Sequence, residues 1–242
     1  MTRLLVSVRD ADEALAAAAA GADFIDLKDP AAGALGGLPP SQVERLVGLI
    51  RARAAGLPVS ATIGDLDARA LDEIVARTTR IAACGVDYVK VGVDAAAGRA
   101  AALALVARLA ELGRAGMPVV PVLVADEGVD EALVRAALRA QVFPALMLDT
   151  RAKRAGSLLQ RVDSASLARF VAAVRAEGCL AGLAGALRLA DLEALRALGP
   201  DFAGFRSAAC AGARADALDP QRVRGLRDGL AAQADARPAL AA

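Results

Sequence analysis

Short apolar runs alternate along the chain with longer segments in which apolar residues recur every three or four positions. The runs are typical of β-strands and the segments of amphipathic helices. Predicted strands cover 4–8, 24–28, 58–64, 87–92, 118–125, 145–150, 179–185 and 202–208. Predicted helices lie near 11–20, 40–55, 67–83, 96–115, 128–140, 163–177, 189–198 and 219–234. This regular alternation predicts parallel strands joined by crossover helices.

The number of strand-helix units indicates the fold. Eight units in a chain of 242 residues match a single (β/α)8 TIM barrel, because neither a composition shift nor a Pro/Ser-rich linker divides the middle. An open doubly wound sheet is the alternative, but the first strand-helix turn, "SVRDADEA", lacks the glycines of a dinucleotide site. We expect one α/β barrel domain over 1–228 and a flexible, Ala-rich tail over 229–242.

Composition limits the classes of partner. Apolar residues make up 56% of the chain, but no run approaches the roughly 20 apolar residues of a membrane span. A net charge of +1 and 2% aromatic residues argue against nucleic acid as a partner. The N-terminus lacks the pattern of a signal peptide, which favours a cytoplasmic protein. Ala-rich outer helices suggest contacts between subunits of a homo-oligomer.

The absence of histidine excludes several kinds of site. Catalysis by Ser-His-Asp or Cys-His groups and histidine-ligated metals are ruled out. The three cysteines, Cys84, Cys179 and Cys210, are too dispersed for a zinc site and fit reduced thiols. We therefore expect neither a metal nor a cofactor, and acid-base chemistry must use carboxylates, lysines or the single tyrosine.

The lysines are unusual in number and position. Only three of the 29 basic residues are lysines: Lys28, Lys90 and Lys153. Lys28 ends a predicted strand, Lys90 lies near the end of another, and Lys153 follows a third by a few residues, all at the face where barrel enzymes carry their active sites. Arginine supplies positive charge everywhere else, so lysine is kept where an amine is needed. A lysine amine can lose its proton in a desolvated, cation-rich site and attack a carbonyl, whereas guanidinium stays protonated.

Two carboxylates accompany the lysines. Side chains alternate along a strand, so Asp26 points into the barrel with Lys28, and Asp149 ends another strand near Lys153. The five residues together predict a Schiff-base site. The competing interpretation is that Asp26–Lys28 and Asp149–Lys153 are buried ion pairs that only fix loops.

The last two predicted strand ends suggest a phosphate site. Their loops, "LAGLAGALR" and "FAGFRSAACAG", are rich in Gly and Ala, and small residues there expose backbone N–H groups to phosphate. The candidates are Gly185 and Ala186 in one loop and Gly204, Arg206 and Ser207 in the other. Tight turns without a ligand are the alternative interpretation.

Several motifs in order resemble one known family. "DLKDP", "PVSATIGD", "VDYVKVG", "MLDTRAKRAGSL" and "GLAGALR", within a similarity over about residues 3–214, resemble the (5-formylfuran-3-yl)methyl phosphate synthases of methanofuran biosynthesis. Asp29 stands where archaeal members have Asn, and Ala186 where Ser is common. These departures change the local charge and remove a possible hydroxyl donor to phosphate.

The resemblance implies a fold, a reaction and residue roles. Such enzymes are (β/α)8 barrels that make a furan aldehyde phosphate from two molecules of glyceraldehyde 3-phosphate. By the resemblance, Lys28 forms the Schiff base, Lys90 transfers protons, and Asp26, Asp149 and Lys153 support them. Two alternatives stay open: another Schiff-base aldolase acting on a sugar phosphate, and a non-catalytic phosphate-binding barrel.

Overall fold

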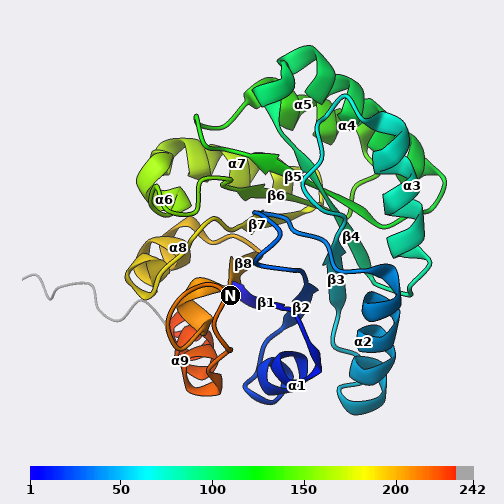
Figure 1. The fold of residues 1–242 in the computed structure, drawn as a ribbon. Coiled ribbons are helices and arrows are strands. Elements are labelled where there is room, and N and C mark those ends of the chain that lie inside the picture. Colours follow the sequence, from blue (N-terminus) through cyan, green and yellow to red (C-terminus); the bar gives the residue numbers. More distant parts are fainter. Residues whose placement is uncertain (233–242) are drawn as a thin grey trace, which may run out of the picture.

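Eight parallel strands close into a barrel in the order β1 to β8, surrounded by helices (Figure 1). The computed structural model describes residues 1–232. The strands are β1 (Arg3–Val8), β2 (Phe24–Leu27), β3 (Val59–Thr62), β4 (Tyr88–Val93), β5 (Val119–Val124), β6 (Ala145–Asp149), β7 (Leu180–Leu183) and β8 (Phe202–Phe205). The closed barrel confirms the predicted single (β/α)8 fold and excludes the open doubly wound sheet.

The outer layer consists of helices that follow the strands. They are α1 (Ala11–Ala19), α2 (Pro40–Arg53), α3 (Leu71–Ala82), α4 (Arg99–Arg114), α5 (Glu131–Ala140), α6 (Leu158–Arg161), α7 (Ser164–Ala176), α8 (Leu192–Leu198) and α9 (Pro220–Ala231). Three short 3₁₀ helices are η1 (Ala95–Ala97), η2 (Leu189–Asp191) and η3 (Ser207–Ala209). Aspartates cap several helix starts, because a carboxylate accepts from backbone N–H groups of the first turn: Asp10 before α1, Asp130 before α5, Asp163 before α7 and Asp219 before α9.

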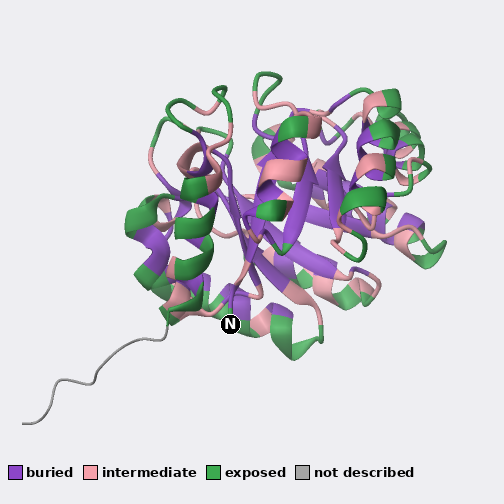
Figure 2. Cartoon of the chain, turned by 90° about the horizontal axis from the view of Figure 1, so that it is seen from below, coloured by how far each residue is buried: buried purple, intermediate pink, exposed green. Residues whose placement is uncertain are grey.

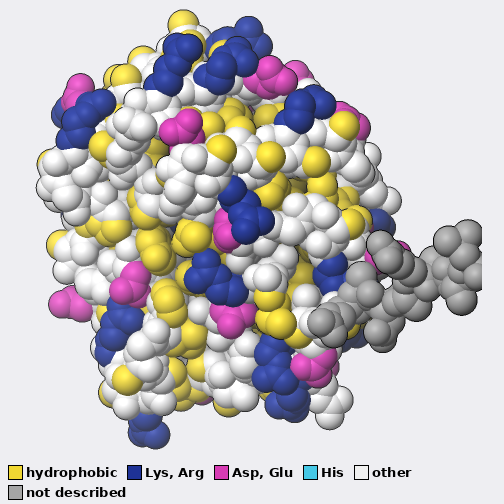
Figure 3. All heavy atoms as spheres, turned by 180° about the vertical axis from the view of Figure 1, so that it is seen from behind, with side chains coloured by type: hydrophobic (Ala, Val, Ile, Leu, Met, Phe, Trp, Pro, Cys, Tyr) yellow, Lys and Arg dark blue, Asp and Glu magenta, His cyan; other side chains and the backbone are white. Residues whose placement is uncertain are grey.

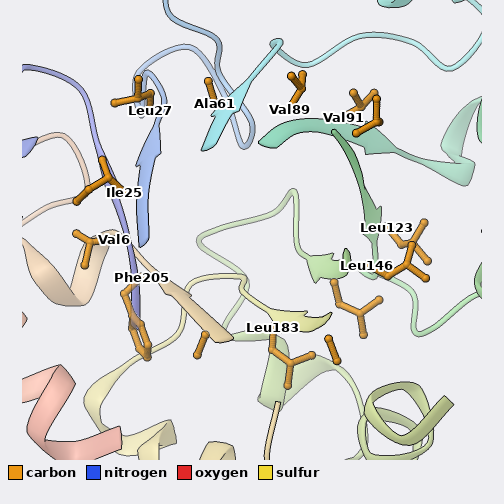
Figure 4. Close-up of a cluster of buried hydrophobic side chains, with 14 of the residues drawn as sticks. Val6, Ile25, Leu27, Ala61, Val89, Val91, Leu123, Leu146, Leu183 and Phe205 are labelled. Atoms are coloured by element: carbon orange, nitrogen blue, oxygen red, sulfur yellow. The ribbon is translucent and has the colours of Figure 1, made fainter. Parts of the chain in front are cut away.

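Alternation along the strands separates two buried clusters. One residue set points outward and packs under the helices, forming a ring around the strands (Figure 4). It includes Val89 and Val91 on β4, which flank the inward-facing Lys90. The other set fills the barrel interior, where Tyr88 packs against a cluster that includes Leu5, Val122 and Phe202. Burial is greatest in the strands, and the helices are exposed on their outer faces (Figure 2).

Some predicted boundaries need correction. The helix expected over 96–115 is divided, because Gly98 has a φ of 103° between η1 and α4. Residues 229–231, which fall in the expected tail as well as in the helix predicted over 219–234, belong to α9, and Leu230 is buried there. Residues 233–242 of the expected tail lie outside the described residues. The short helix α6 was not predicted.

The molecular surface carries charges of both signs. Basic and acidic side chains are interspersed with apolar ones on the face in Figure 3. Within residues 1–232, the helices are all too short or too polar to cross a bilayer. Cys84, Cys179 and Cys210 are free thiols, as expected.

Candidate active site

The three lysines meet at the C-terminal end of the barrel. Lys28 follows β2, Lys90 lies on β4, and Lys153 follows β6 by four residues. All three line one cavity, together with Asp149 at the end of β6. They come together because alternate residues of each strand face the barrel interior, where side chains from several strands meet. The sequence-based prediction that these side chains converge therefore agrees with the geometry.

Asp26 is the centre of a buried hydrogen-bond network. Its side chain is fully buried and lies 2.7 Å from the Lys90 ammonium nitrogen, measured from Oδ1 to Nζ. Ser60 donates to the same oxygen at 2.7 Å, and Ser7 donates to the other oxygen at 2.9 Å. Burial alone raises the pKa of Asp26, but the charges of Lys90 and Lys28 and the hydrogen bonds from Lys90 and Ser60 hold it below its usual value. Asp26 is therefore a carboxylate that fixes the position of Lys90.

The ion pairing differs from the alternative interpretation in one respect. Asp26 pairs with Lys90, not with its strand neighbour Lys28. The ion pairs formed within residues 1–232 include none with Lys28. Lys28 thus has a different environment from the other two lysines.

Lys28 is buried and has a strongly shifted pKa. Its side chain is 5% exposed. Burial lowers the pKa of Lys28 to about 7, a shift that Asp149 and Asp26 oppose and that the positive charges of Lys153 and Lys90 increase. A large fraction of this amine is therefore neutral near pH 7. A neutral, buried amine beside a cavity is equipped to attack a carbonyl carbon.

Asp149 and Lys153 form the second carboxylate–ammonium pair. Lys153 donates from Nζ to Oδ1 of Asp149, which also accepts from the backbone N–H of Thr150 at 2.7 Å. Burial alone raises the pKa of Asp149, but the charges of Lys153 and Lys28 outweigh it and lower the pKa. The charges of two lysine–aspartate pairs therefore act on Lys28.

The loop after β7 has an unusual backbone. Gly185 has a φ of 113°, and Ala186, which is not a glycine, has a φ of 48°. Neither residue donates its backbone N–H to another group in the described part of the chain. Both residues line the cavity that contains Lys28. The loop therefore offers unpaired amide donors at the cavity, as a phosphate site requires.

The loop after β8 differs from the prediction in one residue. Ser207 and Gly204 line the cavity, where a side chain at Gly204 would meet Met147 and Ala184 at 3.1 and 3.2 Å. The guanidinium of Arg206 was the expected phosphate contact, but its five N–H groups are all donated within the protein.

The contacts of Arg206 are with α1 and with its own loop. It donates to both carboxylate oxygens of Glu13, at 2.5 and 3.1 Å, and to the backbone oxygen of Ser7 at 3.1 Å. It also donates to the backbone oxygens of Arg214 at 2.9 Å and Asp216 at 2.8 Å. The sequence showed a basic residue after an apolar strand but could not show its partner, since Glu13 is 193 residues away.

We expect Arg206→Ala to destabilise the fold, because it leaves the carboxylate of Glu13 buried without its cation. The loss in free energy of unfolding should be about 3–5 kcal/mol, measured by urea denaturation. The double variant Glu13→Met/Arg206→Met removes both charges and should recover most of the loss. If Arg206→Ala alone unfolds at the same urea concentration as the unaltered protein, the buried pair has no structural role.

Sequence reasoning missed several residues of this site. Ser7 and Ser60 stand in register with Asp26 on the neighbouring strands, and their signal was a polar residue within each apolar run. Arg214 lines the cavity from the loop after η3 and had no distinguishing signal among the many arginines. Leu35, from the loop between β2 and α2, packs into the barrel interior.

Solved structures share the barrel architecture. The 3-hexulose-6-phosphate synthase of Salmonella typhimurium has a TM-score of 0.64 and 17% identity, covering 95% of this chain and 99% of that one. Phosphoribosyl anthranilate isomerase of Thermus thermophilus has a TM-score of 0.64 and 15% identity, covering 95% and 98% of the two chains. At these identities the likeness concerns the fold alone.

Similarity in sequence is more specific. A Methylorubrum extorquens protein with the provisional name (5-formylfuran-3-yl)methyl phosphate synthase is 45% identical over 226 residues, which is 91% of this chain and 88% of that protein. The (5-formylfuran-3-yl)methyl phosphate synthase of Methanothermobacter thermautotrophicus is 31% identical, covering 86% and 89% of the two chains. The enzyme of that name from Methanosarcina mazei is 28% identical, covering 93% and 97%.

A model of one protein family accounts for almost the whole barrel. The family is described as 4-HFC-P synthase, and its model matches residues 4–227, from the first strand into the last helix. The resemblance in the sequence motifs is thus confirmed. This chain belongs to the 4-HFC-P synthase family, a family of enzymes whose named relatives are (5-formylfuran-3-yl)methyl phosphate synthases.

Proposed function

We propose that this enzyme condenses two molecules of glyceraldehyde 3-phosphate to (5-formylfuran-3-yl)methyl phosphate through an imine on Lys28. The product would serve as a furan precursor of a methanofuran-type carrier. The atoms balance when one inorganic phosphate and two water molecules are released. The reaction is redox-neutral, so its stoichiometry calls for no oxidant or reductant. Because a carbon–oxygen bond to phosphate is broken by elimination, the enzyme would be a lyase.

The carbon skeleton of the product defines the bonds to be made. The formyl carbon, the ring carbon that bears it and the following ring carbon derive from a first triose, which has lost its phosphate. The remaining carbons derive from a second triose, which keeps its phosphate. The carbon–carbon bond joins C3 of the first triose to C2 of the second, and the ring oxygen joins C2 of the first to C1 of the second.

Lys28 would begin the reaction on the first triose. Its neutral amine attacks the aldehyde carbon, and loss of water gives an imine, which makes the proton on C2 more acidic. Removal of that proton allows the phosphate on C3 to leave with the electrons of its carbon–oxygen bond. This assignment is supported by the burial of Lys28, its pKa of about 7 and the lack of an ion pair in residues 1–232.

Lys90 and Lys153 would move the protons. Each amine is held by a buried carboxylate, Asp26 for Lys90 and Asp149 for Lys153. A positioned ammonium can protonate the oxygen that leaves as water or phosphate, and the amine that remains can accept a proton from carbon. The aspartates would keep both groups oriented at the cavity.

The loops after β7 and β8 would bind phosphate. Gly185 and Ala186 offer backbone N–H groups, and Ser207, at the start of η3 after the neighbouring strand β8, lines the same cavity. The observation that carries the proposal as a whole is the position of Lys28. A buried amine of lowered pKa lies in one cavity with two lysine–aspartate pairs, in a chain that belongs to this family.

The reaction can be tested by its stoichiometry. The purified enzyme, incubated with glyceraldehyde 3-phosphate, should form one furan aldehyde for each inorganic phosphate released. The furan is measured by its ultraviolet absorbance and mass, and the phosphate by a colorimetric assay. A Schiff-base aldolase that forms a sugar phosphate would consume the substrate without releasing phosphate. That result would reject the furan-forming reaction while leaving Lys28 as the nucleophile.

A further inference from the structure

Arg214 is a cationic side chain that the proposed chemistry does not yet use. It lies in the loop between η3 and α9 and lines the cavity that contains Lys28. Its Nη2 donates to the backbone oxygens of Gly33 at 3.0 Å and Ala34 at 3.2 Å, in the loop between β2 and α2. Arg214 therefore connects two loops at the C-terminal end of the barrel.

The guanidinium of Arg214 lacks a counter-ion within the described chain. The ion pairs of residues 1–232 do not include Arg214, whereas Arg206 in the same loop region pairs with Glu13. The Nε of Arg214 is buried and makes no hydrogen bond to any described residue. A buried donor that carries charge is costly unless it meets an acceptor. An anion in the cavity would supply both the acceptor and the opposite charge.

Burial also affects the pKa of Arg214. Desolvation lowers the pKa of Arg214, which the charges of nearby carboxylates such as Asp149 partly oppose. The guanidinium nevertheless remains protonated near neutral pH, because an arginine is not deprotonated in proteins. It is thus a permanent positive charge facing the same cavity as the amide groups of Gly185 and Ala186.

Arg206 contacts the loop that carries Arg214. All five of its N–H groups are donated within the protein, and two of them bind the backbone oxygens of Arg214 and Asp216. Its ion pair with Glu13 anchors this loop to the start of α1. Arg206 is therefore placed to act as a positioning residue for the loop that carries Arg214.

We propose that Arg214 contacts the phosphate of the triose bound at Lys28, and that Arg206 positions it for this contact. The inference rests on the proposed function for the identity of the substrate, but phosphate binding itself does not depend on imine formation. Arg214 would select a phosphorylated aldehyde over an unphosphorylated one, because Nε and Nη1 can donate to two phosphate oxygens together.

Binding of inorganic phosphate to the complete protein gives the direct test. In titration calorimetry at fixed ionic strength, Arg214→Met should weaken the phosphate Kd about ten- to a hundredfold, the loss of a charge-assisted contact. Arg154→Met is the matched control, because Arg154 is an exposed arginine that does not line the cavity. Its Kd should stay within about twofold of the unaltered protein. A Kd unchanged in Arg214→Met, or no phosphate binding by the unaltered protein, would overturn the inference.

A second measurement separates phosphate contact from a purely structural role. Borohydride trapping on Lys28 is compared between glyceraldehyde 3-phosphate and unphosphorylated glyceraldehyde. Arg214→Met should slow trapping of the phosphorylated aldehyde about ten- to a hundredfold and leave that of glyceraldehyde unchanged. Equal slowing of both would mean that Arg214 acts only by holding the loop at Gly33 and Ala34. Loss of trapping on Lys28 in the unaltered protein, with phosphate binding intact, would reject the proposed function and not this inference.

Discussion

Replacing Lys28 by Arg or Met is expected to abolish furan formation, lowering the rate by at least about a thousandfold, because neither side chain can form an imine. Borohydride reduction in the presence of glyceraldehyde 3-phosphate should add mass to the peptide that contains Lys28, and neither variant should be labelled there. Label found on Lys90 or Lys153 in the unaltered enzyme would assign the nucleophile to that residue.

The two Lys28 variants should differ in stability. Arg keeps a permanent charge at a position that is 5% exposed, so Lys28→Arg should be the less stable of the two. In the unaltered protein the folded pKa of about 7 lies below the ordinary lysine value of 10.5, so between these values the unfolded chain binds more protons. Stability from this group therefore rises with pH from about 7 to 10.5. Lys28→Met has no ionisable group at this position and therefore lacks this pH dependence of stability. Its free energy of unfolding relative to the unaltered protein should be most favourable at about pH 7, the lower end of this range.

The same pKa predicts the pH dependence of trapping. Only the neutral amine attacks the aldehyde, so the trapping rate should rise with pH up to about 7 and become constant above it. Rates measured at several pH values with saturating borohydride give this profile. A midpoint close to 10.5 would show that the folded protein does not shift the pKa of Lys28.

Replacing Lys90 by Gln is expected to separate imine formation from furan formation. The Gln amide can still donate to Asp26, but it cannot transfer a proton, so furan production should fall about a hundredfold or more while the imine on Lys28 still forms. Loss of the Lys90 charge should also raise the pKa of Lys28, since that charge lowers it. The midpoint of the trapping profile should therefore move above 7.

Lys90→Arg provides the matched comparison. It keeps a positive charge beside Asp26, so the trapping profile should stay closer to that of the unaltered enzyme, but guanidinium does not transfer protons. Both variants should thus lose furan synthesis and differ in the pH midpoint. Robust furan synthesis by Lys90→Gln would contradict a role in proton transfer. Loss of the imine together with the fold would show that the Asp26–Lys90 pair is structural.

The sequence predicts the fold well because each layer has its own period. Strands buried on both sides read as apolar runs, and helices show a repeat of three to four residues, so the eight units were visible without coordinates. Boundaries were less certain, since a cap or a single backbone angle decides them. Asp94 caps η1 and Gly98 separates it from α4, which divides one predicted helix. The predicted homo-oligomer stays a prediction.

The amines and carboxylates of the site were also predictable in part. Lys28 and Lys90 stood out because lysine is rare in this chain and because both lie near the ends of predicted strands, a local property that the sequence displays. The inward direction of the Asp26 side chain followed from the alternation of side chains along one strand. These inferences needed only residue type and position within a unit.

The tertiary structure decided which side chains from different strand-helix units form ion pairs. Asp26 on β2 pairs with Lys90 on β4 and leaves Lys28 without an ion pair in residues 1–232, and Arg206 pairs with Glu13 across 193 positions of sequence. Such partners depend on the register between strands and on the paths of the loops, which no periodic signal records. The sequence by itself determined a (β/α)8 barrel with lysines at its catalytic end. Only closure of the barrel decided which of the three lysines lacks an ion pair within residues 1–232, and which of the two arginines at the cavity lacks a counter-ion there, because burial and charge pairing are set by residues far apart in the chain.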